Sequence, residues 1–118
     1  MGTYAEHRDY FDFTLAETFV QTRDYSTAAT ILRRMGADEP SAPLAARMLL
    51  ARALYSSAQL GRAEALLRSV VADRPDEAYA HLMLGRVLQR AGRAEEARAP
   101  LRLAAAMGLT LDGAAQSA

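Results

Sequence analysis

The sequence contains no cysteine, no tryptophan and no lysine, and these absences exclude several kinds of site. Without cysteine there can be no disulfide, no thiolate metal site and no cysteine nucleophile. No apolar run approaches the roughly 18 to 20 residues that a membrane-spanning helix needs. Residues 1–9 also lack the basic and apolar regions of a secretory signal. The sequence therefore predicts a cytoplasmic protein with no membrane anchor.

The basic residues are all arginine, and the 14 arginines balance 14 acidic residues to a net charge of zero. Zero net charge argues against a general nucleic-acid binder. The charges are unevenly distributed, because residues 1–40 hold seven acids and four arginines, a net charge of −3, and the remainder carries +3. This asymmetry permits head-to-tail contacts between copies, which salt would weaken.

The apolar residues favour helices over strands. They make up 51% of the chain, but only 7% of the chain is aromatic. Alanine and leucine dominate and β-branched residues are scarce, which is the composition of a helical protein. Periodicity and punctuation predict six helices, over residues 7–22, 25–36, 43–58, 62–73, 77–91 and 94–107. Pro43 suits a first helical position, and Asp76 suits an N-cap.

A repeated unit connects these helices. The segments 23–32 and 91–97 each contain a turn followed by alanine. Pro40 and Pro75 lie 35 positions apart, and Leu109 follows 34 positions later. A period of this length is typical of stacked helical repeats, which need about three units for stability because one pair of helices cannot bury its own apolar face.

This pattern resembles the tetratricopeptide repeat family. The family's small positions correspond to Ala16, Ala51 and Gly85 in first helices and to Ala28, Ala63 and Ala97 in second helices. The resemblance implies an all-α fold, a short right-handed α-solenoid of three helix–turn–helix units. The units would span residues 9–42, 44–77 and 78–109, forming a single domain over residues 1–109. Residues 110–118 would be a flexible tail.

The sequence departs from the family pattern at two kinds of position. The bulky residue near the start of each repeat is Asp12, Arg47 and His81, where the family usually has tryptophan. The turn glycine of the second repeat corresponds to Gly61, three places late. One residue is also inserted between Pro40 and Leu44, and it restores the register.

The resemblance implies a groove lined by the first helix of each unit, where a partner protein would bind. The groove residues best suited to binding are Tyr10, Phe13, Glu17, Met48, Arg52, Tyr55, Tyr79, Arg86 and Arg90. The other positions of this set are Val20, Gln21, Ala45, Ser56, Leu82 and Gln89. Aromatic, methionine and arginine side chains are enriched in protein interfaces. The arginines make an acidic peptide a suitable partner, although arginine at exposed helix positions is common.

The last expected helix predicts a second interface. No later helix would cover its apolar residues, and repeat arrays generally need a polar cap. The residues are Leu101, Leu103, Met107, Leu109 and Leu111. Part of this set is expected to face inward, and the rest would be covered by a second copy or by another protein. A self-assembling structural unit is therefore the alternative to an adaptor.

Catalysis is not expected. His7 and His81 are the only histidines, and His81 occupies a repeat-packing position. The acidic pairs Glu95-Glu96 and Asp76-Glu77 open helices, where acids suit the helix dipole. No phosphate loop, zinc-ligand spacing or nucleophile elbow is present, so no cofactor or metal is expected. An RNA-binding accessory role is a remote alternative that rests on the arginine-rich second half.

Overall fold

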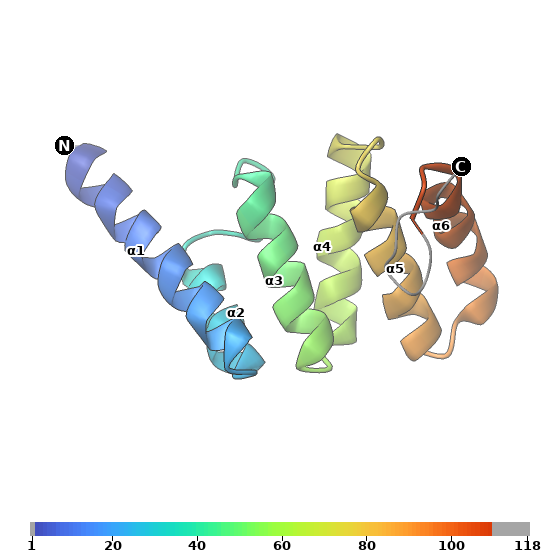
Figure 1. Ribbon diagram of the computed structural model, residues 1–118, viewed down its shortest axis with the longest axis horizontal. Helices are drawn as coiled ribbons and strands as arrows, with labels where there is room; N and C mark the ends of the chain where they lie inside the picture. The colour runs from blue at the N-terminus through green and yellow to red at the C-terminus, as the bar shows by residue number, and fades with distance from the viewer. Residues whose placement is uncertain (1, 110–118) are drawn as a thin grey trace. The chain divides into compact units, whose positions relative to one another are not determined.

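The computed structural model describes residues 2–109, with side chains from Asp9 onward, and this part of the chain forms six α-helices and no strand (Figure 1). They are α1 (Gly2–Gln21), α2 (Tyr25–Arg34), α3 (Leu44–Ser56), α4 (Leu60–Asp73), α5 (Ala78–Arg90) and α6 (Ala94–Ala106). The expected all-α class and the six helices are confirmed. The largest difference in bounds is at α1, which begins at Gly2 instead of residue 7.

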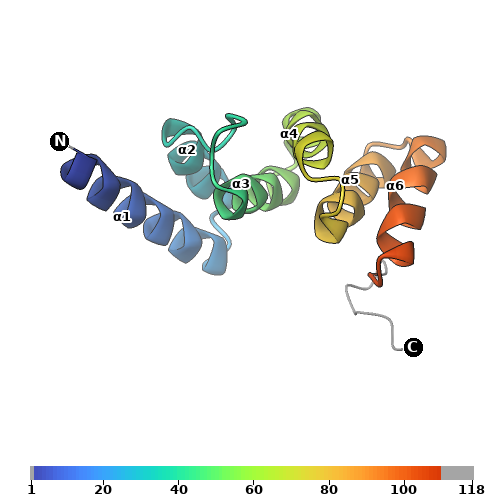
Figure 2. The same cartoon turned by 90° about the horizontal axis from the view of Figure 1, so that it is seen from above.

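The helices form two compact units, one up to Gln59 with α1 to α3 and one from Leu60 with α4 to α6. In the first unit α2 packs against both α1 and α3. In the second unit α5 packs against both α4 and α6, and the two views show α6 beside α5 (Figures 1 and 2). The boundary falls inside the second expected repeat. A single domain over residues 1–109 stays a prediction, and the expected tail lies outside the described residues.

Small residues occupy the buried positions of the helix pairs. Ala16 and Ala28 are both 0% exposed in the first unit, as Ala104 is in the second, where Ala97 is 1% exposed. A Cβ atom added to Gly85 would overlap Leu101 Cδ2 and would lie 2.5 Å from Leu101 Cγ. Leu101 of α6 therefore occupies the space that the missing Gly85 side chain leaves on α5.

One hydrogen-bonded turn ends every described helix except α4. In α5, Gly92 N–H donates to the carbonyl of Gln89 (3.0 Å) and Arg93 N–H donates to that of Leu88 (2.9 Å). The same pair of bonds ends α1, α2, α3 and α6. This is the Schellman motif, which requires a left-handed residue after the helix and satisfies carbonyl groups that the last turn leaves without partners. The exception, α4, ends just before Pro75.

The left-handed position is not always glycine. Gly36 and Gly92 have φ of 81° and Gly108 has 101°, but Arg23 has 65° and Ala58 has 63°. The residues Arg23, Ala58 and Gly92 occupy the same position of the three expected repeats. A side chain in this conformation brings Cβ close to the following carbonyl, which costs roughly 1–2 kcal/mol.

Two expectations about helix punctuation are corrected. Gly61 is not the turn residue of the second repeat, because it lies within α4 and Ala58 makes the turn. The helix starts shift by one residue, since Pro43 is the N-cap of α3 and not its first residue, and Glu77, not Asp76, is the N-cap of α5. Neither of these two N-caps makes a side-chain capping bond. Proline has no side-chain acceptor, so Pro43 could not have capped in this way.

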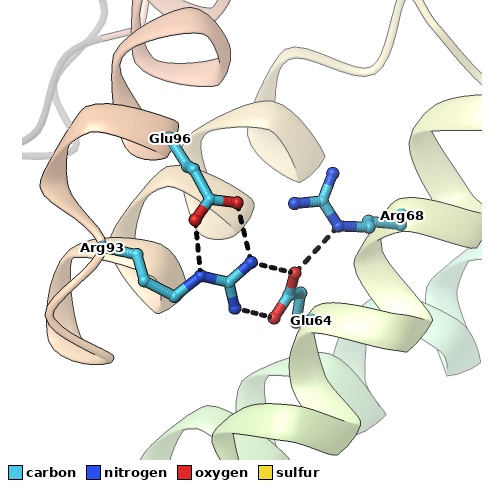
Figure 3. A network of polar contacts seen from close by, with 4 residues as sticks. All are labelled: Glu64, Arg68, Arg93 and Glu96. Carbon is cyan, nitrogen blue, oxygen red and sulfur yellow. Dashed lines mark hydrogen bonds and ion pairs between the residues drawn. The ribbon is translucent and has the colours of Figure 1, made fainter.

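A network of four charged side chains joins α4 to the start of α6 (Figure 3). Arg93 Nη1 donates to Glu64 Oε1 at 2.6 Å, and Arg93 Nε donates to Glu96 Oε2 at 2.9 Å. Arg93 Nη2 donates to both carboxylates, and Arg68 Nε donates to Glu64 Oε2 at 2.9 Å. The planar guanidinium thus binds two carboxylates at once, a geometry that lysine cannot reproduce.

The network shifts the pKa of each of its three central groups. Hydrogen bonds from Arg93 and then Arg68 lower the pKa of Glu64, and the hydrogen bonds from Arg93 lower that of Glu96. The hydrogen bonds to Glu96 and then Glu64 raise the pKa of Arg93. These directions have one cause, because each hydrogen bond is stronger when both partners are charged.

Exchanging the turn residues should change stability in opposite directions. Ala58→Gly should raise the free energy of unfolding by about 1 kcal/mol, because glycine adopts positive φ without strain. Gly92→Ala, at the same repeat position, should lower it by roughly 1–2 kcal/mol. Gly61→Ala is the matched control inside α4 and should raise it by about 0.5–1 kcal/mol through helix propensity. Urea unfolding measures all three, and a stabilised Gly92→Ala variant would contradict the turn assignment.

Acid should remove the stabilisation that the network provides. A carboxylate with a lowered folded-state pKa stabilises the fold above its unfolded-state pKa of about 4.3, and the effect is lost as pH falls through the folded-state pKa. The melting temperature of wild type should exceed that of Glu64→Gln at pH 7. The difference should begin to shrink near pH 4 and should disappear as the pH falls further. Glu39→Gln is the control, because Glu39 is an exposed acid that makes no ion pair with any residue whose side chain is described. An equal difference at pH 7 and pH 3 would contradict this account.

Candidate partner-binding site

An apolar pocket of about 320 Å³ opens on the first unit, and we call it the α1–α3 pocket. Helix α1, the segment between α2 and α3, and the first turn of α3 line it. The lining residues are Asp9, Tyr10, Phe13, Met35, Ala37, Ala42, Pro43, Ala45 and Ala46. Nearly all are apolar, which is typical of a binding pocket that uses few polar groups for specificity.

The local sequence explains why the pocket is open. Four of its lining residues are alanines, so the segment and the start of α3 occupy little space beside the aromatic rings of α1. Gly36, with φ of 81°, turns the chain after α2, and Ala37 follows it with 1% exposure. The inserted residue between Pro40 and Leu44 belongs to this segment, which therefore lies outside the helical register that fills the core.

Aromatic side chains stand at the pocket and beside it. Tyr10 is 70% exposed, and its neighbour Phe11, which does not line the pocket, is 64% exposed. Phe13 is half-buried, three residues after Tyr10, so the two rings share one side of α1. Large exposed aromatic side chains are costly to leave in water and are enriched in interfaces.

The pocket's one charged lining residue is Asp9. No hydrogen bond or ion pair of its side chain exists within the part of the chain whose side chains are described, and the same holds for Asp12, Asp38 and Glu39. Asp38 and Glu39 follow the lining residue Ala37. The nearby Arg47 is buried at 3% exposure and already takes part in an interaction. The one charged side chain among the lining residues is therefore an acid, and no arginine lines the pocket.

The structure brings three of the expected groove residues of the first unit, Tyr10, Phe13 and Ala45, into this pocket. Along the same chain, Glu17 and Arg52 are exposed, while Met48 and Tyr55 are half-buried. Val20, which the family pattern also placed in the groove, is only 5% exposed and belongs to the core. The pocket residues Met35, Ala37 and Pro43 were not expected, because they belong to no groove position. The inserted residue was the available signal for them.

The second unit carries the remaining expected groove residues. Tyr79 is 41% exposed, Arg90 is exposed and Arg86 is half-buried. Both arginines already take part in hydrogen-bonding or electrostatic interactions. Leu82 is 1% exposed, so this expected groove position is a core position. Helix packing explains Leu82, since α5 packs against both α4 and α6.

The expected α6 interface is divided by the structure. Leu101 is half-buried over Gly85, and Leu109 is also half-buried. Leu103 and Met107 are 46% and 41% exposed, and they are one helical turn apart. Leu111 lies outside the described residues. The exposed part of this set is therefore the pair Leu103 and Met107.

The residues that could have suggested catalysis have structural roles. His81 is 7% exposed, and its Nε2 lies 2.8 Å from the carbonyl oxygen of Pro75, so Nε2 carries the proton and donates it. Glu95 and Glu96 lie in the first turn of α6, where Glu96 binds Arg93. His7 lies outside the residues with described side chains. Among those with described side chains, no group of three or more His, Asp or Glu could hold a metal ion.

Membrane insertion finds no support in the helices. Within residues 2–109, none of them combines the length and the apolar character that crossing a bilayer requires. Helix α1 is long enough to approach that length, but it carries acidic residues such as Asp9, Asp12 and Glu17.

Comparison with known proteins agrees with the helical arrangement. A family model described as "Tetratricopeptide repeat" matches residues 19–83 and, overlapping them, residues 54–108. A solved structure titled "MamA MSR-1 C2" matches with a TM-score of 0.75 at 23% sequence identity. The match covers 87% of this chain and 60% of that one, so the chain spans only part of that structure's length. At this identity the likeness shows a shared fold alone. No curated protein matches the sequence.

Proposed function

The chain belongs to the tetratricopeptide repeat family, and from this premise we propose that it is a non-catalytic module that binds a partner protein. The observation that carries the proposal is the α1–α3 pocket, an apolar pocket with the exposed ring of Tyr10 at its opening. Its volume of about 320 Å³ lies at the lower end of the roughly 300–1,000 Å³ range of ligand pockets. A pocket of this size suits one or two side chains of a partner.

The exposed aromatic residues favour a protein partner over a small cofactor. Tyr10, which lines the pocket, and its chain neighbour Phe11 are both largely exposed, and a small molecule held in the pocket would leave most of this aromatic surface in water. A polypeptide can fill the pocket with one side chain and cover these rings with its neighbours. Interfaces of this kind derive most of their affinity from a few such anchors.

Other parts of the function remain proposals of the same kind. The expected preference for an acidic peptide rests on Arg52, Arg86 and Arg90, and we retain it for Arg86 and Arg90 of the second unit. Neither nucleic acid nor a membrane is a proposed partner, because the net charge is zero and no site for either is apparent from composition. We place the protein in the cytoplasm.

Self-assembly is a second candidate, favoured by one observation. Leu103 and Met107 leave an apolar stripe on α6 that no residue with a described side chain buries. A second copy could cover it. This candidate does not exclude the first, because the stripe and the pocket lie on different helices.

Filling the pocket should release the partner. Ala45→Leu adds bulk at an exposed lining residue without entering the core, so the fold should be retained. Affinity purification from the source cells, followed by mass identification, should recover a partner with wild type and lose it with Ala45→Leu. Ala65→Leu makes the same change at an exposed position of α4 and should retain the partner. Equal recovery with all three proteins would overturn the pocket as the docking site.

Light scattering tests the second candidate. Wild type at micromolar concentration should have a mass above that of one 12.8 kDa chain, and the double variant Leu103→Gln, Met107→Gln should return to that mass. The two residues are exposed, so their replacement should change the free energy of unfolding by no more than about 0.5 kcal/mol. A monomeric mass for wild type would exclude self-assembly through α6.

A further inference from the structure

We infer that the α1–α3 pocket selects a partner segment in which a large apolar side chain stands next to a lysine or arginine. The inference rests on the proposed function and specifies its ligand. It differs from the acidic peptide expected from the arginines, because it concerns a different surface with the opposite charge.

The apolar half of this preference follows from the lining. Tyr10, Phe13 and Met35 provide the large contact surfaces, and the alanines leave the space between them. A leucine, methionine or phenylalanine side chain would bury its apolar area against these groups and gain free energy from leaving water. A polar side chain would find few partners, since Asp9 and Tyr10 are the only lining residues with polar side-chain groups.

The cationic half follows from Asp9. Its carboxylate lines the pocket, is exposed, and makes no ion pair within the part of the chain with described side chains. Asp12 lies three residues further along α1, and Asp38 and Glu39 follow the lining residue Ala37, so acids stand near lining residues in two segments of the chain. An acidic ligand would be repelled here, and a cationic one would be attracted from solution.

None of the arginines with described side chains lines the pocket. Arg33 and Arg34 lie in the last turn of α2, where positive charge suits the helix end, and neither lines the pocket. Arg47 is buried and takes part in an interaction within the protein. Charge complementarity therefore selects the basic form among the apolar segments that fit.

Three short peptides test the charge preference on the full chain. The probes are acetyl-Arg-Phe-Leu-Arg-amide and the same peptide with glutamine or with glutamate in place of arginine. Methyl resonances of Met35 and Ala45, followed by NMR during titration, report occupation of the pocket. The arginine peptide should bind about two- to five-fold more tightly than the glutamine peptide, as expected for exposed ion pairs. The glutamate peptide should bind most weakly, and added salt should reduce these differences.

Two variants assign the preference to Asp9. Asp9→Asn keeps the shape of the side chain and should bring the arginine and glutamine peptides within two-fold of each other. Asp76→Asn, an exposed acid of the second unit, should leave the preference unchanged. Thermal melting of both variants confirms that each is folded before the titrations are compared.

The outcomes separate this inference from the proposed function. Equal or tighter binding of the glutamate peptide would overturn the cationic preference. Persistence of the arginine preference in Asp9→Asn would overturn the role of Asp9. Failure of all three peptides to shift the Met35 resonance would overturn the inference, whereas the proposed function would fail only if Ala45→Leu still recovered the cellular partner.

Discussion

The close approach of paired helices is the constraint on which the rest of this structure depends. At Gly85 the two backbones are near enough that the leucine from the facing helix occupies the place of a side chain. Ala16 of α1 and Ala28 of α2 have no exposed area and allow a close approach of these helices in the first unit. Close packing of this kind gives dispersion contacts that a looser pair would lose. It also limits which residues remain available for binding, because every residue in the contact is buried between the helices.

The helix-ending turns and the charged network of Arg93 stabilise the fold in addition to this packing. The Schellman hydrogen bonds recur at helix ends whether the left-handed residue is glycine, alanine or arginine, so the backbone bonds and the helix packing impose the conformation on Arg23 and Ala58. Arg93 is the N-cap residue of α6, and its guanidinium binds Glu64 of α4. This contact connects two helices that both pack against α5. Residues 91 to 93 thus contain both the turn that ends α5 and the arginine that binds α4.

Much of the fold could be predicted from the sequence because the small positions repeat with a fixed period. The same rule could not identify Ala58 as the turn residue, since nothing in its side chain marks a positive φ and Gly61 nearby was the more obvious candidate. Val20 and Leu82 followed the family's groove positions but are buried here, because burial depends on which helices pack on each side. Met35 lies near the end of the first expected repeat and Pro43 lies between the first and second, and neither is a groove position, so the family pattern did not place them in the pocket.

The segment between α2 and α3 has a consequence for how recognition could diversify. It borders the α1–α3 pocket, yet it contributes no residue to the tight contacts between helices such as the one at Gly85. Insertions or deletions there would reshape the recess while the paired helices kept their spacing. Changes in the exposed residues after the buried Ala37 could therefore alter the proposed ligand preference while the buried helix contacts are kept.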